Sequence, residues 1–238
     1  MLLIDKPSGI TAAEVVRILK RRLQPRKIGH GGTLDPLATG LLVLLLGRGT
    51  KLSSKFLEGE KTYTGVIRLG IQTDADDITG TVLSTDEALE EKFPASVRNE
   101  LAAKAAQAFL GTQQQVPPRF SALKVGGRRS YDLAREGKSV ALAPREITLA
   151  ELRLKFLSAE KLEYFVRCSK GTYVRSLARD IARFLGTVGC VESLCRESAA
   201  GFELRSACPL DAISLDTLAM HLLPLAANGS LLEIPLSK

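Results

Sequence analysis

Hydrophobic residues recur along the chain with two different periods. Behind Thr11, the stretch 12–23 places apolar residues at three- and four-residue intervals, which predicts an amphipathic helix capped by that threonine. Helices are also predicted over 95–110, ending at Gly111, and over 172–185, ending at Gly186. Continuous apolar runs or alternation predict strands over 2–5, 41–46, 61–70 and 188–198, and a hairpin of 145–157 with 161–168.

Three segments lack a clear period. The stretch 71–92 is acidic and is predicted as a loop, whereas 113–138 is basic and irregular, with a helix predicted from Ser130 to Arg135. From about residue 206 the chain is leucine-rich but less regular. Because helices and strands do not alternate regularly, the pattern favours an α+β fold with a central, mostly antiparallel mixed sheet flanked by helices and loops.

Composition narrows the classes of protein. The 238 residues are 45% hydrophobic, which suits one large domain, alone or with a short appendage. Aromatic residues make up only 5% and tryptophan is absent, which disfavours an open sheet that stacks many bases. The net charge of +7 and the pI near 9.3 favour a polyanionic partner, with an ordinary basic surface as the alternative.

Cysteine and histidine usage argues against a metal site. The four cysteines form no C-x-x-C pair, and only two histidines accompany them, so they are interpreted as reduced packing residues. The apolar run 41–46 is too short to span a bilayer, and the N-terminus lacks the features of a secretory signal. The expected localisation is therefore cytoplasmic, with no metal and no membrane partner.

Asp35 stands between a glycine-rich turn and an apolar run, in IGHGGTLDPLATGLLVLLLG (28–47). Glycines at 29, 31 and 32 permit a tight turn or a close approach of another group, and Pro36 stiffens its exit. The carboxylate is either a positioned nucleophile or base, or a turn residue that bonds nearby amides. A nucleotide-phosphate loop is disfavoured, because no G-K-[ST] follows GHGG.

A resemblance narrows these alternatives. It rests on DKPSGIT (5–11), GHGGTLDPLATGLLVLLLGRGTK (29–51), KTYTGVIRLGIQTDADDITG (61–80), QVPPRFSALKVGGRRSYDLAREG (115–137) and CSKGTYVRSLARDI (168–181). In this order the five segments resemble the TruB-type tRNA pseudouridine synthases, which isomerise uridine 55 in the T loop. The resemblance implies a pseudouridine synthase fold and a reaction without a cofactor. It also implies a catalytic domain over 1–205 and a short C-terminal segment over 206–238, in which the PUA-type RNA-binding module of many relatives is largely absent.

The same resemblance assigns roles to individual residues. Asp35 is the expected catalytic carboxylate, Arg175 its guanidinium partner and Tyr63 the ring that stacks on the flipped uracil. From the residues alone, Arg175 could instead be a surface residue and Tyr63 an ordinary strand tyrosine. The substrate-binding residues implied by the family pattern are His30, which fills the space of flipped bases, Tyr173 and Leu194, which line the uracil pocket, and Lys6, which supports it. For Leu194 a plain core position remains the alternative.

Basic residues supply the expected contacts with the RNA backbone. They are Arg21, Arg22, Lys27, Arg119, Lys124 and Arg128. A solvated basic surface is the alternative for each. The expected protein is thus a monomeric enzyme whose partner is tRNA, through its T stem-loop. Two alternatives are a pseudouridine synthase for another RNA and a tRNA-folding chaperone that acts by binding alone.

Overall fold

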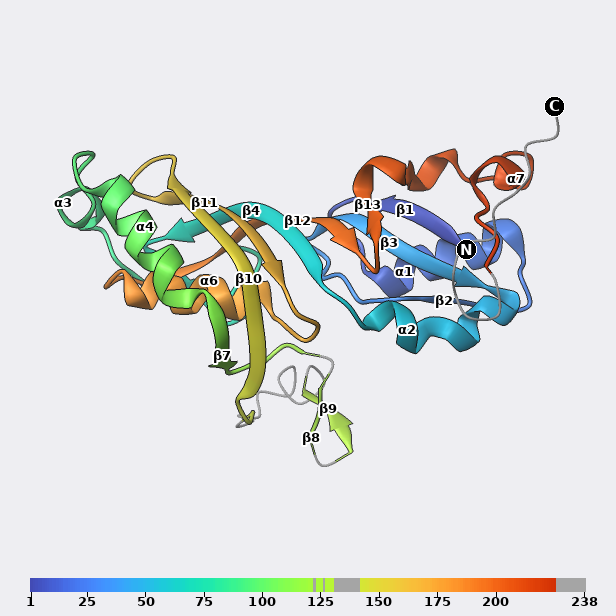
Figure 1. Ribbon diagram of the computed structural model, residues 1–238, viewed down its shortest axis with the longest axis horizontal. Helices are drawn as coiled ribbons and strands as arrows, with labels where there is room; N and C mark the ends of the chain where they lie inside the picture. The colour runs from blue at the N-terminus through green and yellow to red at the C-terminus, as the bar shows by residue number, and fades with distance from the viewer. Residues whose placement is uncertain (122, 126, 131–141, 226–238) are drawn as a thin grey trace. The chain divides into compact units, whose positions relative to one another are not determined.

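The computed structural model describes residues 1–121, 123–125, 127–130 and 142–225. The chain forms two compact units, one from Met1–Thr62 with the chain from Cys195 onward, the other from Tyr63–Leu194 (Figure 1). The stretch 1–205, which was expected to be one catalytic domain, is divided between the two units, and the first unit continues beyond residue 205. The boundary near residue 205 stays a prediction. Each helix within the described residues is too short or too polar to cross a lipid bilayer.

The first unit is built on strands that are covered on both faces. Strand β1 (Leu2–Lys6) pairs antiparallel with β3 (Thr39–Leu46), and β2 (Ile28–His30) also pairs antiparallel with β3. β14 (Cys208–Pro209) lies parallel to β1, and β12 (Gly189–Ala199) lies parallel to β3 through Cys195 and Arg196. The short β13 (Phe202–Glu203) extends from β12.

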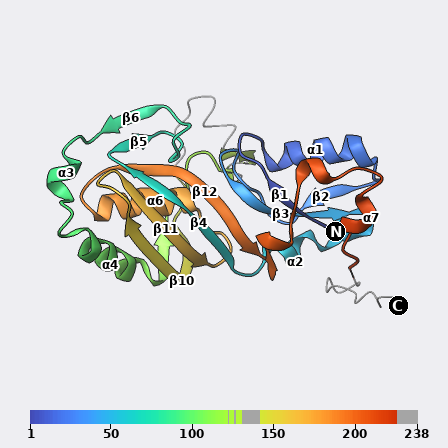
Figure 2. The same ribbon diagram turned by 90° about the horizontal axis from the view of Figure 1, so that it is seen from above.

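Helices α1 (Ala12–Leu23) and α2 (Ser53–Leu57) lie on opposite sides of these strands (Figure 2). Phe56 of α2 belongs to a buried cluster with Leu3, Leu41, Val43 and Leu45, the residues of one face. On α1, Val15 and Leu19 are fully buried. A strand covered on both faces buries consecutive residues, and this explains the unbroken apolar run of 41–46. The rest of the unit comprises the 3-10 turns Gly47–Leu52, Leu204–Ser206 and Leu210–Ala212, and α7 (Leu218–His221).

The second unit contains the long strands of the predicted hairpin. β10 (Arg145–Phe156) and β11 (Lys161–Cys168) pair antiparallel, and the strand order is β12-β4-β11-β10-β7. β4 spans Lys61–Leu69 and β7 spans Gly111–Gln115. Helix α4 (Arg98–Phe109) packs on β10 through the buried Ala102 and Ala105. Helix α6 (Val174–Phe184) buries Leu177, Ala178, Ile181 and Ala182.

Most of the predicted elements are confirmed, and so is the α+β class with a mixed, mostly antiparallel sheet. Thr11 accepts a hydrogen bond from the amide of Glu14, 2.9 Å away, and caps α1 as predicted. Gly186, just beyond α6, has a φ of +77°, the left-handed conformation that commonly follows a helix C-terminus.

The loop predicted over 71–92 is wrong. This segment holds a hairpin of β5 (Ile71–Thr73) and β6 (Val82–Thr85), then the short helix α3 (Leu89–Lys92). All four residues of β6 are exposed, so no alternation of buried and exposed positions marks it in the sequence.

Besides the five-residue β7 and the two-residue β13 and β14, three further short strands were not predicted. The glycine-rich stretch before Asp35 includes β2, and the irregular basic segment includes the paired β8 (Lys124–Val125) and β9 (Arg128–Arg129). Strands of two or three residues are specified by the partner strand rather than by a local period. The helix predicted from Ser130 to Arg135 lies, beyond Ser130, outside the described residues.

Candidate active site

Asp35 lies in a turn that connects β2 to β3 in the first unit. Its side chain is half-buried, between the buried Leu34 and Ala38, and its carbonyl oxygen accepts a hydrogen bond from the Ala38 amide at 3.1 Å. Strand β3 begins one residue later, at Thr39. The carboxylate is therefore carried by a short turn at the start of a strand whose six central residues are buried, as the sequence pattern predicted.

Glycine is required in this region because other groups approach the backbone closely. A Cβ at Gly31 would lie 2.5 Å from the Cβ of Phe56. A Cβ at Gly40, which has a φ of +95°, would lie 2.5 Å from the carbonyl oxygen of Arg196. These glycines serve the packing of the Asp35 turn on its neighbours, a role that glycine alone fulfils because it has no side chain.

Lys6 holds the part of the turn that comes directly after Asp35 in the chain. Its side chain is fully buried, and its ammonium group donates to the carbonyl oxygens of Pro7 and Ile10, each at 2.7 Å, and of Pro36 at 3.3 Å. The amide of Gly9 also donates to the Pro36 carbonyl, at 2.8 Å. The DKPSG turn and the Asp35 turn are thus joined through one buried cation.

The pKa of Lys6 is lowered to about 8, mainly because the ammonium group is buried; the Asp35 carboxylate raises this pKa and the nearby Arg196 guanidinium lowers it. The Asp35 carboxylate therefore opposes the cost of burying the lysine.

Arg196 holds the part of the turn that comes before Asp35 in the chain. Sequence reasoning did not identify this residue. The side chain is only 2% exposed. Its guanidinium donates to the carbonyl oxygen of Leu41 at 2.7 Å, and to those of Gly32 and Thr33, each at 3.2 Å. The available signal was an arginine inside the predicted strand 188–198, because charged residues are rarely buried without a specific role.

His30 lies at the end of β2 and is half-buried. Burial lowers its pKa, and the Arg196 guanidinium lowers it further, so the imidazole is neutral at neutral pH. Its buried Nδ1 atom has no hydrogen-bond partner among the described residues. A neutral ring is compatible with the predicted role of filling space, which stays a prediction.

Arg175 is the second residue of α6 in the other unit, and it is buried rather than at the surface. The residue is 5% exposed. Its Nη1 donates to the carbonyl oxygen of Ala75 and its Nη2 to that of Phe120, both at 2.8 Å. The alternative of an ordinary surface arginine is therefore wrong, because two carbonyl groups from distant parts of the chain fix the plane of the guanidinium.

Tyr173, directly before α6, is fixed by Gln115, a second residue that sequence reasoning missed. The buried Gln115 side chain accepts from the Tyr173 amide at 2.9 Å and donates to its carbonyl oxygen at 3.1 Å. Tyr63 and Leu194 are also buried, on the neighbouring strands β4 and β12. Burial of Tyr63 and Leu194 fits both a core position and a pocket wall, and Tyr173 is half-buried. The roles of these three residues therefore stay predictions.

The predicted RNA-contacting residues differ in their surroundings. Arg21, Lys27 and Arg119 are exposed. Arg22 is exposed as well, but its Nη1 donates to the carbonyl oxygens of Leu210 at 2.7 Å and Ile213 at 3.1 Å, so it stabilises the fold of the first unit. The side chains of Lys124 and Arg128 lie outside the described part of the chain. The predicted RNA contact of each residue stays a prediction.

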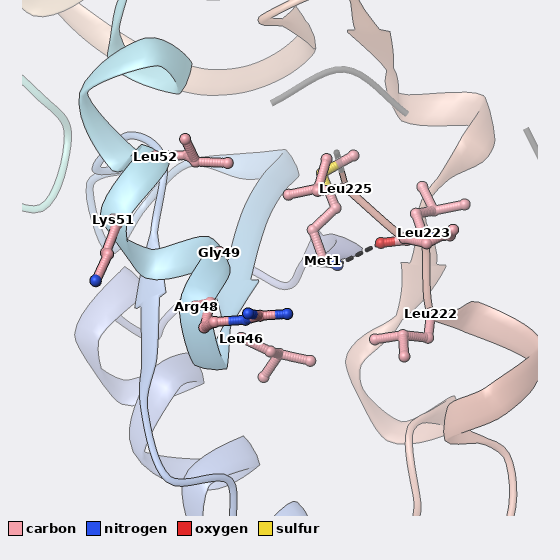
Figure 3. Close-up of a pocket in the computed structure, with 10 residues that line it drawn as sticks. Met1, Leu46, Arg48, Gly49, Lys51, Leu52, Leu222, Leu223 and Leu225 are labelled. Atoms are coloured by element: carbon pink, nitrogen blue, oxygen red, sulfur yellow. Dashed lines mark hydrogen bonds between the residues drawn. The ribbon is translucent and has the colours of Figure 1, made fainter. Parts of the chain in front are cut away.

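The predicted site residues coincide neither with a group of possible metal ligands nor with the leucine-lined cavity of the first unit. Within the described residues, no group of three or more His, Cys, Asp or Glu side chains could hold a metal ion. A cavity of about 530 Å³ in the first unit is lined mainly by leucines, with Arg48 and Lys51 at its wall (Figure 3). The N-terminal ammonium group donates to the Leu223 carbonyl oxygen there, at 2.5 Å. This cavity joins the N-terminus to the segment after α7 and contains none of the predicted site residues.

Comparisons with known proteins agree with the fold and the motifs. The profile described as "TruB family pseudouridylate synthase (N terminal domain)" matches residues 20–174. A protein of Psychrobacter arcticus named tRNA pseudouridine synthase B is 41% identical over 235 residues, 95% of this chain and 60% of its own length. One of the same name from Opitutus terrae is 41% identical over 214 residues, 90% of this chain and 86% of its own length.

A solved structure of a Cbf5-Nop10-Gar1 complex contains the same fold. It has a TM-score of 0.67 and 24% identity, with 92% of this chain and 54% of that chain covered. The chain spans 60% to 66% of the length of three similar curated relatives, from Psychrobacter arcticus, Psychrobacter cryohalolentis and a Synechococcus strain. The matched profile and the Opitutus terrae relative nevertheless cover most of the chain, and the chain therefore belongs to the TruB family of pseudouridylate synthases.

Proposed function

We propose that this protein isomerises uridine to pseudouridine at position 55, in the T loop of tRNA. The observation that carries the proposal is the match to the Opitutus terrae protein named tRNA pseudouridine synthase B, because it extends over 86% of that protein at 41% identity. A match over nearly the whole length of a relative supports transfer of the activity as well as of the fold.

The reaction breaks the bond between ribose C1′ and N1 of uracil and forms a bond between C1′ and C5. A proton leaves C5 and another is gained at N1, so substrate and product are isomers. Asp35 acts as the ionised carboxylate, which attacks C1′, adds to C6 or serves as the base of a glycal route. The buried Lys6 and Arg196 side chains support this role, since their hydrogen bonds hold the turn on both sides of Asp35.

Arg175 and Tyr63 complete the proposed site. Arg175 pairs with the Asp35 carboxylate and orients it, which suits a guanidinium that is already fixed by two carbonyl groups. The target uridine must leave its stack before C1′ can be reached, and Tyr63 then stacks on the extruded base. His30, Tyr173, Leu194 and Lys6 surround or support the extruded nucleotide.

The T stem-loop is proposed to bind through its phosphates. The net charge of +7 and the exposed Arg21, Lys27 and Arg119 support an electrostatic footprint, to which Lys124 and Arg128 would add. A synthase for another RNA and a chaperone that acts by binding alone are the two competing functions. The synthase for another RNA would modify a different site, and the chaperone would bind tRNA without forming pseudouridine.

The experiment uses a T-arm stem-loop labelled with tritium at C5 of the uridine at position 55. Wild-type protein is expected to release tritium and to yield pseudouridine at that position. Asp35→Asn is expected to bind the stem-loop with nearly unchanged affinity and to release none. Binding by the wild type without any product would favour the chaperone function.

Product mapping on total tRNA from cells that lack the protein identifies the target in vivo. Loss of pseudouridine at position 55 is the expected result. Retained pseudouridine at position 55, with loss at a site in another RNA, would overturn the proposed substrate.

A further inference from the structure

Arg175 and Arg179 lie one turn apart on α6, and both approach the turn between β5 and β6. Arg175 donates to the carbonyl oxygen of Ala75, as described above. The Nη1 of Arg179 lies 2.9 Å from Oδ2 of Asp76, the next residue of that turn. Side chains at positions i and i+4 lie on the same face of a helix, so adjacent residues of one turn can bind both guanidinium groups.

Asp76 combines two features that oppose folding. Its φ is +58°, in the left-handed region, which is strained for a residue other than glycine and tolerated best by Asn and Asp. The residue is also 7% exposed. Burial raises the pKa of Asp76, whereas the guanidinium groups of Arg179 and Arg175 lower it. Asp76 thus combines backbone strain with a buried charge, and it directly follows Ala75, whose carbonyl oxygen binds Arg175. This combination indicates that the protein requires a carboxylate at this position.

The backbone of Asp76 is anchored as firmly as its side chain. Its carbonyl oxygen accepts from the amide of Val191 on β12 at 3.0 Å, and the Val191 carbonyl oxygen accepts from the amide of Ile78 at 2.8 Å. Arg179 is held in turn by Asp180 at 3.0 Å and by the carbonyl oxygen of Val116 at 3.1 Å. The ion pair therefore fixes the position of the β5–β6 turn along the axis of α6. It thereby also fixes where the Ala75 carbonyl oxygen lies relative to the Arg175 guanidinium.

We propose that Asp76 and Arg179 are a positioning pair, which sets the orientation in which Arg175 presents its guanidinium to the reacting carboxylate. Neither residue touches the substrate in this proposal, and both act through the Ala75 carbonyl group. The inference rests on the proposed function, in which Arg175 pairs with Asp35. A buried ion pair contributes little net stability, because desolvation offsets its attraction, but it can select one arrangement among several.

The experiment is a double-mutant cycle measured on the single-turnover rate of pseudouridine formation in the T-arm stem-loop. Asp76→Asn removes the charge but keeps the size and the tolerance of left-handed φ. It is expected to lower the rate about tenfold with unchanged affinity for the stem-loop. In the Arg175→Lys background, the same change is expected to lower the rate no further, because it acts through Arg175.

Arg179→Lys is the second variant, in case Asp76→Asn does not fold. It keeps the charge but cannot bind Asp76, Asp180 and Val116 together, so the same pattern of rates is expected. Glu90→Gln is the matched control, because it breaks the exposed Arg98–Glu90 pair of the same unit, 2.8 Å long, which lies on α3 and α4 and does not involve Arg175. Its rate is expected to equal that of the wild type.

Several outcomes would overturn the positioning role. These are an unchanged rate in the Asp76 and Arg179 variants, an equal loss of rate in both Arg175 backgrounds, or a loss of affinity in place of rate. A loss of unfolding free energy without a loss of rate would likewise assign the pair to folding alone. A wild-type protein that forms no pseudouridine would instead refute the proposed function, and the positioning role with it.

Discussion

The backbone of Arg196 occupies the space that a side chain at Gly40 would need. A Cβ at Gly40 would lie 2.5 Å from the carbonyl oxygen and 2.7 Å from the amide nitrogen of Arg196, at the point where β3 and β12 pair. These two atoms belong to a strand and cannot move aside as a side chain would. The pairing of β3 with β12 in turn brings the Arg196 guanidinium to the turn that carries Asp35.

Gly40→Ala is accordingly expected to destabilise the protein. The variant combines backbone strain at φ +95° with overlap against the Arg196 backbone, and we expect a loss of roughly 2–4 kcal/mol in the free energy of unfolding. Urea denaturation measures the loss. Gly59→Ala is the matched control, because Gly59 has a φ of +84° but no heavy atom within 4 Å of the added Cβ. The control should lose only about 1 kcal/mol. Equal losses in the two variants would show that overlap with Arg196 has no role.

Lys6 makes stability depend on pH in a predictable direction. Its pKa in the folded protein is about 8, below the ordinary value of 10.5, so the unfolded chain binds more protons between these values. The contribution of Lys6 to the free energy of unfolding is therefore least below pH 8 and rises as the pH increases toward 10.5. Relative to Lys6→Met, the wild type is expected to gain up to about 3 kcal/mol over this range.

Denaturant unfolding at several pH values between 7 and 10.5 tests this expectation. The same comparison with Lys104→Met serves as control, because Lys104 is an exposed residue of α4 and its ammonium pairs with the equally exposed Glu100. If the free energy of unfolding changed with pH in the same way for the wild type and Lys6→Met, the lowered pKa of the buried Lys6 would be contradicted.

Arg175→Lys is expected to lose activity although it keeps the charge. An ammonium group cannot donate in the plane that joins the carbonyl oxygens of Ala75 and Phe120 and also face a carboxylate. We expect the single-turnover rate to fall roughly 100-fold or more, with the affinity for T-arm RNA nearly unchanged. Arg153→Lys, at an exposed position of β10, is the control with the same chemical change. A nearly normal rate in Arg175→Lys would remove this arginine from the proposed site.

Salt is expected to act on substrate binding and not on the chemical step. The KM for the T-arm stem-loop should rise steeply with ionic strength, because each phosphate contact releases counterions on binding. The rate at saturating RNA should change little. Arg21→Gln and Lys27→Gln should each reduce the slope of the logarithmic plot by about one. A KM that does not depend on salt would refute the basic footprint.

The sequence by itself determined the elements whose signals are local. The period of 12–23 and the capping Thr11 specify α1, and the two long alternating stretches specify the hairpin of β10 and β11, because their hydrophobic faces and turns are encoded within a few residues. The five motif segments likewise sufficed to identify the family. By contrast, β2 and β6 have no such signal, since their partner strands define them.

Only the tertiary structure decided how the functional turns are held. Arg196 binds carbonyl groups more than 150 positions earlier in the chain, Lys6 binds Pro36, and Arg179 binds Asp76 across 103 positions. The sequence around Arg196 and Lys6 shows ordinary basic residues, because a hydrogen bond to a backbone carbonyl leaves no mark on the residue that accepts it. The physical reason is that burial and partner choice depend on chain segments that meet only after folding.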